Sequence, residues 1–143
     1  MLRHERGEDV NIMAISFWVP MLPPTTTHQM KQVTVRGGKP TFYETPELAD
    51  ARAKLTAHLG GHVPAVPFST AVGLMVKWCF PLAGKHHDGE YKTTRPDTDN
   101  LQKLLKDVMT KLGFWTDDAL VASEVVEKFY AEKPGIYIAI REL

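Results

Sequence analysis

The sequence predicts a single α/β (α+β) domain in which a mixed β-sheet is flanked by two main helices. Three observations lead to this fold class. The 143 residues, 43% of them hydrophobic, are enough for one domain with one core. Two segments have the start and stop signals of helices, and the other apolar segments are short and strand-like in composition. We expect residues 1–11, which are charged and lack periodicity, to be a loose extension of a domain formed by residues 12–143.

In the first third of the chain, strand signals alternate with turn formers. Residues 12–19 are predicted to be a strand. The prolines that follow predict a loop over residues 20–29, because proline removes a backbone donor and fixes φ. Gly37-Gly38 separates residues 32–36 from residues 41–43, and two glycines between short strand-like segments predict a hairpin.

The first helix is predicted from its boundaries. Thr45 is a preferred N-cap residue, and Pro46 suits the first helical position because its missing N–H would have no helical partner there. Gly60-Gly61 is a stop signal. We therefore expect a helix from Pro46 to about Leu59.

The second helix is predicted from its hydrophobic stripe. After Asn100, apolar residues recur at helical spacing until Gly113, which ends the pattern. These residues are Leu101, Leu104, Leu105, Val108, Met109 and Leu112. A helix that begins at Leu101 would bury this stripe against the rest of the domain.

Three further segments complete the predicted sheet. Residues 69–80 are apolar and β-branched and should form a long central strand, followed by a polar loop over residues 83–94. Residues 119–130 are predicted to be a strand, and residues 132–135 a turn. Isoleucines alternate with other residues over 136–140, as expected for a half-buried last strand.

Composition restricts the possible functions. The formal net charge is zero at neutral pH, which argues against coating nucleic acid through bulk positive charge but allows a local basic surface. Cys79 is the only cysteine, so neither an intramolecular disulfide nor a thiolate zinc site can form, and we expect a buried, unreactive thiol. No apolar stretch is long enough to span a bilayer and no signal peptide pattern is present. We therefore expect a cytoplasmic protein without membrane contact.

The most informative segment is Arg95-Pro96-Asp97-Thr98-Asp99-Asn100. Asp97 and Asp99 point to nearly opposite sides in an α-helix but to the same side of an extended backbone. Both can bind one metal ion only if the helix begins after them, with Asp99 or Asn100 as its cap. A hard cation such as Mg²⁺ would suit these oxygen ligands. Acidic residues at a helix start are also common as simple caps, and the residues alone leave both interpretations open.

Lys103 and the pair Asp117-Asp118 are the next candidates. Lys103 lies four residues after Asp99, where it would either stabilise a phosphate oxyanion or form a helical ion pair worth ~0.2–0.5 kcal/mol. Asp117-Asp118 is either a turn former or a source of carboxylate ligands, and spacing alone does not show whether it approaches Asp99. Lys106 and Lys111 are expected to be solvated or to contact backbone phosphates. Together these residues indicate a metal-dependent phosphodiesterase.

Other polar and aromatic side chains are weaker candidates. Adjacent histidines such as His86-His87 cannot readily face one metal ion, and Glu44 and Glu90 are possible additional oxygen ligands. The large aromatic residues are more typical of a core than of base-stacking platforms. These are Trp78, Phe114, Trp115 and the four tyrosines.

Two segments together resemble the signature of RusA-type Holliday junction resolvases. The first is Arg95-Pro96-Asp97-Thr98-Asp99-Asn100-Leu101-Gln102-Lys103, and the second is Gly113-Phe114-Trp115-Thr116-Asp117-Asp118. The resemblance is strongest between Gly89 and Val126. Earlier elements agree in their order, so it covers most of the chain after Met13.

The resemblance implies a small α/β homodimer that uses Mg²⁺ to resolve four-way DNA junctions by paired symmetric nicks. It implies a role in recombination and repair and a phage or prophage origin. Asp97, Asp99 and Asp118 correspond to the catalytic, metal-binding acids of that family, and Lys103 corresponds to its catalytic lysine. The residues that we expect to contact DNA are Lys92, Arg95, Lys106 and Lys111.

Two alternatives stay open on the sequence. An Asp-x-Asp element also binds metal and pyrophosphate in nucleotide-sugar transferases, although this chain is short for one and has no obvious nucleotide-binding loop. A junction-binding protein without cleavage activity is the second alternative. The intact acids and Lys103 argue against it.

Overall fold

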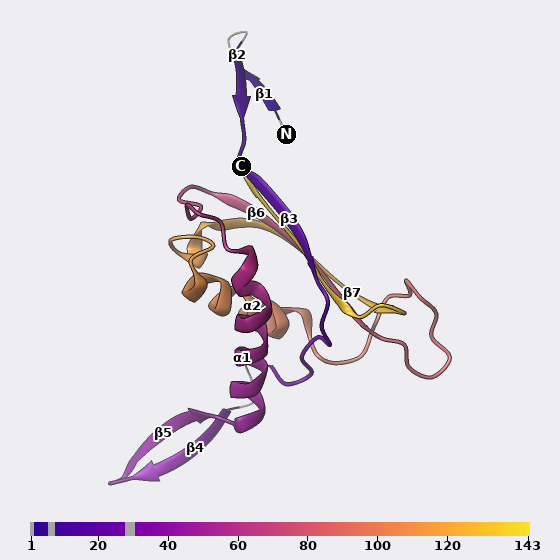
Figure 1. The fold of residues 1–143 in the computed structure, drawn as a ribbon. Coiled ribbons are helices and arrows are strands. Elements are labelled where there is room, and N and C mark those ends of the chain that lie inside the picture. The colour runs from indigo at the N-terminus through magenta and orange to yellow at the C-terminus, as the bar shows by residue number, and fades with distance from the viewer. Residues whose placement is uncertain (1, 6–7, 28–30) are drawn as a thin grey trace.

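The computed structural model describes residues 2–5, 8–27 and 31–143 (Figure 1). Its centre is one four-stranded sheet, with two helices packed beside it and two separate two-stranded ribbons. Among the described residues, no helix has the length and apolar character needed to cross a lipid bilayer. The predicted combination of a mixed sheet and two main helices is confirmed.

The strand order of the main sheet is β3-β8-β6-β7. Strands β3, β8 and β6 are antiparallel neighbours, whereas β7 runs parallel to β6 along the sheet edge. The sheet is therefore mixed. The bounds of its strands are Ala14–Val19 for β3, Val72–Pro81 for β6, Val121–Ala131 for β7 and Gly135–Glu142 for β8.

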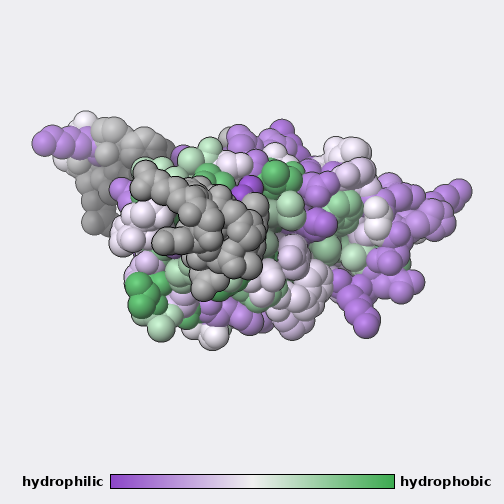
Figure 2. Space-filling view, turned by 90° about the horizontal axis from the view of Figure 1, so that it is seen from above, coloured by the Kyte–Doolittle hydropathy of each residue, from purple (hydrophilic) through white to green (hydrophobic). Residues whose placement is uncertain are grey.

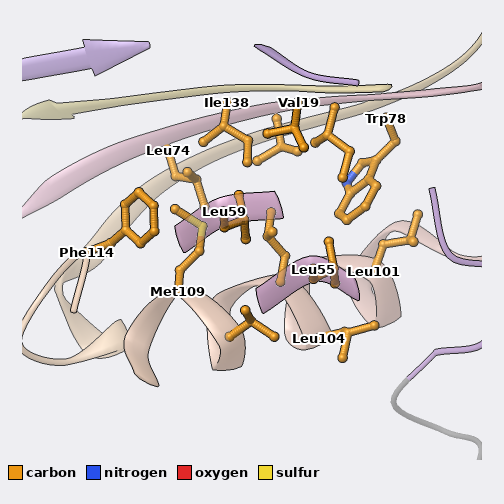
Figure 3. Packing of buried hydrophobic residues seen from close by; sticks show 14 of the residues in the cluster. Val19, Leu55, Leu59, Leu74, Trp78, Leu101, Leu104, Met109, Phe114 and Ile138 are labelled. Carbon is orange, nitrogen blue, oxygen red and sulfur yellow. The ribbon is translucent and has the colours of Figure 1, made fainter. Parts of the chain in front are cut away.

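Helices α1 (Pro46–Leu59) and α2 (Thr98–Leu112) pack on one face of this sheet. Figure 3 shows Leu74, Trp78 and Ile138 of the sheet pointing toward both helices, and these three side chains are almost completely buried. Burying one large apolar side chain contributes about 1.5–3 kcal/mol. The core between sheet and helices therefore fixes how α2 lies against β6 and β7.

Helix α1 has the boundaries that its sequence predicts. The Thr45 hydroxyl accepts a hydrogen bond from the Leu48 N–H at 3.2 Å, which satisfies one of the four donors left open at a helix start. Pro46 occupies the first helical position. The α-helix ends at Leu59 and continues only as a single 3₁₀ turn, η1 (Gly60–His62).

Helix α2 begins earlier than its hydrophobic stripe predicts. Its first residue is Thr98, and Asp97 is the N-cap residue with extended backbone angles. The other end agrees with prediction, because Gly113 has a φ of 92° and its N–H bonds the Met109 and Thr110 carbonyls. Helix α2 therefore begins at Thr98 and not, as predicted, at Leu101.

Two ribbons stand apart from the main sheet in Figure 1. Strands β4 (Lys31–Arg36) and β5 (Lys39–Glu44) form the predicted hairpin, in which both turn glycines have a positive φ. Strands β1 (Leu2–Glu5) and β2 (Glu8–Asn11) also pair, a ribbon that the sequence did not predict.

The boundary of the domain at residue 12 stays a prediction. The predicted loop over residues 20–29 has no helix or strand up to residue 27, and its last two residues lie outside the described ones.

The loop between β6 and α2 folds back along β7. The Gly89 N–H bonds the Tyr130 carbonyl at 2.8 Å, the Tyr130 N–H bonds the Glu90 carbonyl at 2.8 Å, and the Lys92 N–H bonds the Lys128 carbonyl at 2.9 Å. Residues 82–89 are exposed, and this end of the molecule is strongly hydrophilic at the right of Figure 2. By running backward along β7, the loop brings the start of α2 beside the middle of that strand.

Candidate active site

A cavity of about 430 Å³ between α2 and β7 collects most of the predicted catalytic residues. Asp99, Lys103 and Lys106 line it from α2, and Asp118 lines it from the 3₁₀ turn η2 (Asp118–Leu120) that precedes β7. The remaining lining residues are Thr98, Gln102, Glu124 and Val126. Residues nearly twenty positions apart in the chain therefore meet at one surface hollow.

The spacing along α2 explains why one helix presents several polar groups to the cavity. Asp99, Gln102, Lys103 and Lys106 are separated by three, one and three residues, and positions i, i+3, i+4 and i+7 share one helical face. The apolar stripe of the same helix is buried in the core. Amphipathicity therefore orients the site, because burying one face points the other toward β7.

Asp97 and Asp99 occupy different backbone environments. Asp97 has a φ of −76° and a ψ of 148°, whereas Asp99 lies within the first helical turn. The expectation that both carboxylates sit on one extended segment is therefore wrong. Asp99 lines the cavity and Asp97 is not among its lining residues. In the described parts of the chain, no three Asp, Glu, His or Cys side chains are grouped closely enough to hold a metal ion.

The two neighbouring aspartates after α2 have different roles. The Asp117 side chain accepts a hydrogen bond from the Ala119 N–H at 2.9 Å and so caps the turn η2. Asp118 is the residue that lines the cavity. Asp117 therefore forms the turn, and Asp118 is the candidate site residue.

Asp99 and Asp118 suit a hard divalent cation. Both residues line the same cavity, and one Asp99 carboxylate oxygen accepts a hydrogen bond from the Asn100 N–H at 2.9 Å. Mg²⁺ is commonly held by one or two carboxylates, with water and substrate phosphate completing its coordination. The donor set therefore fits this class of ion without a complete protein cage.

Lys103 is available to a substrate. It is exposed and lines the cavity. Within the described residues it makes no hydrogen bond or ion pair, so the alternative of a helical ion pair with Asp99 is not formed. An uncommitted ammonium beside two carboxylates is well placed to contact a phosphate group.

A polar network that was not predicted from the sequence joins Glu124, Gln102 and Trp78. The Gln102 amide nitrogen donates to Glu124 at 2.9 Å, and its carbonyl oxygen accepts from the Trp78 indole N–H at 2.7 Å. Lys106 also donates to Glu124, at 3.1 Å. These contacts depend on how β7 packs against α2. No local pattern could have indicated them.

Lys128 holds the segment that leads into the acidic motif. Its ammonium donates to the Thr94 carbonyl at 2.7 Å and to the Pro96 carbonyl at 2.8 Å. Burial lowers the pKa of Lys128, and the nearby charge of Lys92 lowers it further, while Asp97 acts in the opposite direction. Lys128 was not predicted as a site residue, yet it fixes the backbone immediately before Asp97.

The four predicted DNA contacts lie in four different places. Lys106 lines the cavity, whereas Lys111 is exposed in the last turn of α2 and Arg95 is exposed just before Asp97. Lys92 donates to the Thr94 hydroxyl at 2.7 Å and lies over the rings of Phe80 and Tyr130. Their contacts with DNA stay predictions.

The weaker candidates lie outside the cavity. His86 Nδ1 is 2.6 Å from Glu90 Oε2, and this hydrogen bond lowers the pKa of Glu90. Glu44 forms an ion pair with Arg52 at 2.6 Å. Neither glutamate is among the residues that line the site.

The prediction of an aromatic core is partly confirmed. Trp78, Phe114 and Trp115 are buried, but Tyr43 and Tyr91 are 45% and 64% exposed. Those two tyrosines were therefore wrongly assigned to the core.

Cys79 is a free thiol of intermediate burial, and desolvation raises its pKa. The thiol is therefore only partly buried, and not fully buried as predicted, while the raised pKa favours its protonated form at neutral pH.

Comparison with known proteins places the chain in one class. A family model described as Endodeoxyribonuclease RusA matches residues 21–141. The chain is 34% identical over 120 residues to the crossover junction endodeoxyribonuclease rusA of Lactococcus phage r1t, which covers 82% of this chain and 90% of the phage protein. The class is thus that of nucleases that hydrolyse phosphodiester bonds within DNA.

Two further similarities are local. Over 41 residues the chain is 51% identical to the crossover junction endodeoxyribonuclease RusA of Escherichia coli strain K12, covering 29% of this chain and 34% of that protein. Over 51 residues it is 43% identical to the uncharacterized protein YqaN of Bacillus subtilis strain 168, covering 36% and 35%. The chain belongs to the RusA family of endodeoxyribonucleases. This membership removes the nucleotide-sugar transferase alternative.

Proposed function

We propose that the protein resolves four-way (Holliday) DNA junctions by paired symmetric nicks, and that Mg²⁺ is the metal it requires. The observation that carries the proposal is the shared cavity of Asp99, Lys103 and Asp118. The name of the phage relative, a crossover junction endodeoxyribonuclease, supports a four-way junction as the substrate. We further propose a role in DNA recombination and repair, in the cytoplasm, for a protein of phage or prophage origin.

The proposed roles follow from the chemistry of each side chain. Asp99 and Asp118 would hold the cation. Asp97 would add a third ligand, because its extended backbone at the N-cap of α2 exempts the Asp97–Asp99 pair from helical i, i+2 geometry. A divalent cation at such a site supplies charge neutralisation and orients water for in-line attack on the phosphate. Lys103 would stabilise the departing oxyanion, and Lys106 would contact the DNA backbone beside it.

Cleavage assays test the substrate and the metal together. A four-way junction, a flap and a linear duplex of matched sequence would be incubated with the protein, with and without Mg²⁺. We expect paired symmetric cuts in the junction alone, and none when EDTA replaces Mg²⁺. Junction binding without any cleavage in Mg²⁺ would instead identify a binding protein.

Replacement of Lys103 by alanine should reduce turnover more than affinity. The Lys103 ammonium faces the cavity without another partner among the described residues, so it is free to stabilise charge that develops during cleavage. We expect single-turnover cleavage to fall by about a hundredfold or more, with junction affinity reduced only a few-fold. If affinity fell and turnover did not, Lys103 would be an ordinary phosphate contact.

We propose that the active enzyme is a C2 homodimer. Two symmetric cuts across a junction are most simply made by two active sites related by the same two-fold axis. The helices cover only one face of the main sheet, and the other face carries a shallow cavity of about 370 Å³ whose lining includes Met75, Val125 and Tyr137. An apolar, uncovered sheet face suits a second copy of the same surface.

A charge on this uncovered face should dissociate the dimer. We expect Met75→Glu to shift the mass measured by light scattering at micromolar concentration from dimer to monomer, because Met75 is 37% exposed and a carboxylate there would be desolvated in the interface. Lys111→Glu, on the exposed end of α2, is the control and should stay dimeric. A wild-type monomer with full cleavage activity would contradict the proposal.

A further inference from the structure

Glu124 faces the active-site cavity but is bonded to residues of its own chain. Its two carboxylate oxygens accept hydrogen bonds from the Gln102 amide at 2.9 Å and from the Lys106 ammonium at 3.1 Å. The Lys106 and Glu124 side chains are both about three-quarters buried. The pair therefore joins β7 to α2 across the wall of the proposed site.

Hydrogen bonds that begin at a core residue fix the position of Glu124. Gln102 is only 3% exposed, and its carbonyl oxygen accepts from the indole N–H of the fully buried Trp78. A primary amide has one accepting and one donating end. Since the indole occupies the accepting end, the amide NH₂ must face the cavity, where it holds Glu124.

The consequence concerns the position of Lys106. Lys106 lines the same cavity as Asp99 and Asp118, the two carboxylates proposed to bind the cation. A lysine ammonium on its flexible stem can exchange between nearby carboxylates. In the structure the Lys106 ammonium pairs with Glu124 and forms no ion pair with Asp99 or Asp118.

We propose that Glu124 is a positioning residue that keeps Lys106 away from Asp99 and Asp118 and so leaves both carboxylates open to a divalent cation. This inference rests on the proposed metal-dependent function. Glu124 acts through Lys106 and does not bind the cation itself. Its contribution therefore disappears when Lys106 is removed.

Calcium binding without DNA tests this dependence. Ca²⁺ affinity would be measured by titration calorimetry for the wild type, Glu124→Gln, Lys106→Met and the double variant Glu124→Gln/Lys106→Met. We expect Glu124→Gln to weaken Ca²⁺ binding by about three- to fivefold, the scale of one solvent-accessible ion pair. The double variant should bind Ca²⁺ as tightly as Lys106→Met. Thermal unfolding in EDTA would establish that each variant is folded.

A second double variant distinguishes an effect of the position of the lysine from an effect of the net charge of the protein. Glu124→Gln/Lys111→Met has the same net charge as the first double variant, but Lys111 is not among the residues that line the cavity. We expect it to bind Ca²⁺ as weakly as Glu124→Gln alone. Equal recovery in both double variants would overturn the proposal in favour of a general charge effect.

Three other outcomes would also overturn it. Unchanged Ca²⁺ affinity in Glu124→Gln would show that Glu124 does not control the acids, and this inference would fail while the proposed function stands. Weak binding that persists in Glu124→Gln/Lys106→Met would make Glu124 a direct ligand. A wild type that binds no Ca²⁺ and cleaves no junction in Mg²⁺ would remove the proposed function, and this inference with it.

Discussion

Asp118→Asn should reduce junction cleavage by about a thousandfold or more while leaving junction affinity in metal-free buffer nearly unchanged. Asp118 lines the same cavity as Asp99, and an amide of the same size as the carboxylate binds Mg²⁺ poorly. Asp99→Asn should behave in the same way. Single-turnover cleavage and gel-shift titrations on one four-way junction would measure the two effects separately.

Asp117→Asn is the matched control for this prediction. It makes the same chemical change one residue earlier, but Asp117 caps the turn η2 and asparagine retains that capping ability. We expect near wild-type cleavage. Wild-type turnover by Asp118→Asn would exclude Asp118 from the site. Asp97→Asn is the most informative third variant, because Asp97 is a predicted ligand that does not line the cavity.

Gly135→Ala should destabilise the fold by about 1–3 kcal/mol or more. Gly135 begins β8, and a methyl group on its Cα would overlap the Trp18 indole and lie 2.6 Å from the Val19 carbonyl oxygen. Both neighbours belong to β3, so relief would require the two strands to separate. Urea unfolding, followed by tryptophan fluorescence, would give the change in the free energy of unfolding.

Gly61→Ala is the control for backbone substitution. Gly61 lies in η1, and a Cβ there would have no neighbour within 4 Å. We expect a change within about 0.5 kcal/mol. If Gly135→Ala were as stable as Gly61→Ala, the close approach of β3 to the start of β8 would be wrong.

Most elements could be predicted because their signals are local. Thr45 and Gly113 determine helix ends through their own backbone and side-chain hydrogen bonds. The Gly37-Gly38 turn depends only on the freedom of two glycines to adopt positive φ. Such features need no knowledge of distant residues, so the sequence is sufficient for them.

The start of α2 could not be predicted reliably. Asp97, Asp99 and Asn100 are all favoured N-cap residues, so capping preference alone does not choose among them. The structure selects Asp97 and places Asp99 in the first turn. As a result, Asp97 is extended and Asp99 is helical, and only Asp99 lines the cavity.

The assembly of the site depends on tertiary packing. Asp99 and Asp118 share the cavity because the loop after β6 returns along β7, through backbone bonds to Lys128 and Tyr130, and so brings the start of α2 beside that strand. Glu124 joins it through the packing of β7 against α2. In sequence, Glu124 is one charged residue in a strand. Only the fold gives it Gln102 and Lys106 as partners.

The position of β8 within the sheet has a consequence for protein synthesis. β8 comes after every other described strand in the chain, yet it lies between β3 and β6. While residues before Gly135 are emerging from the ribosome, β3 and β6 have no strand to pair with on their facing edges. Pairing partners more than a hundred residues apart also slow folding. The segments that line the candidate site are therefore translated first, and the nascent chain lacks the strand that joins β3 to β6 until residues 135–142 have been made.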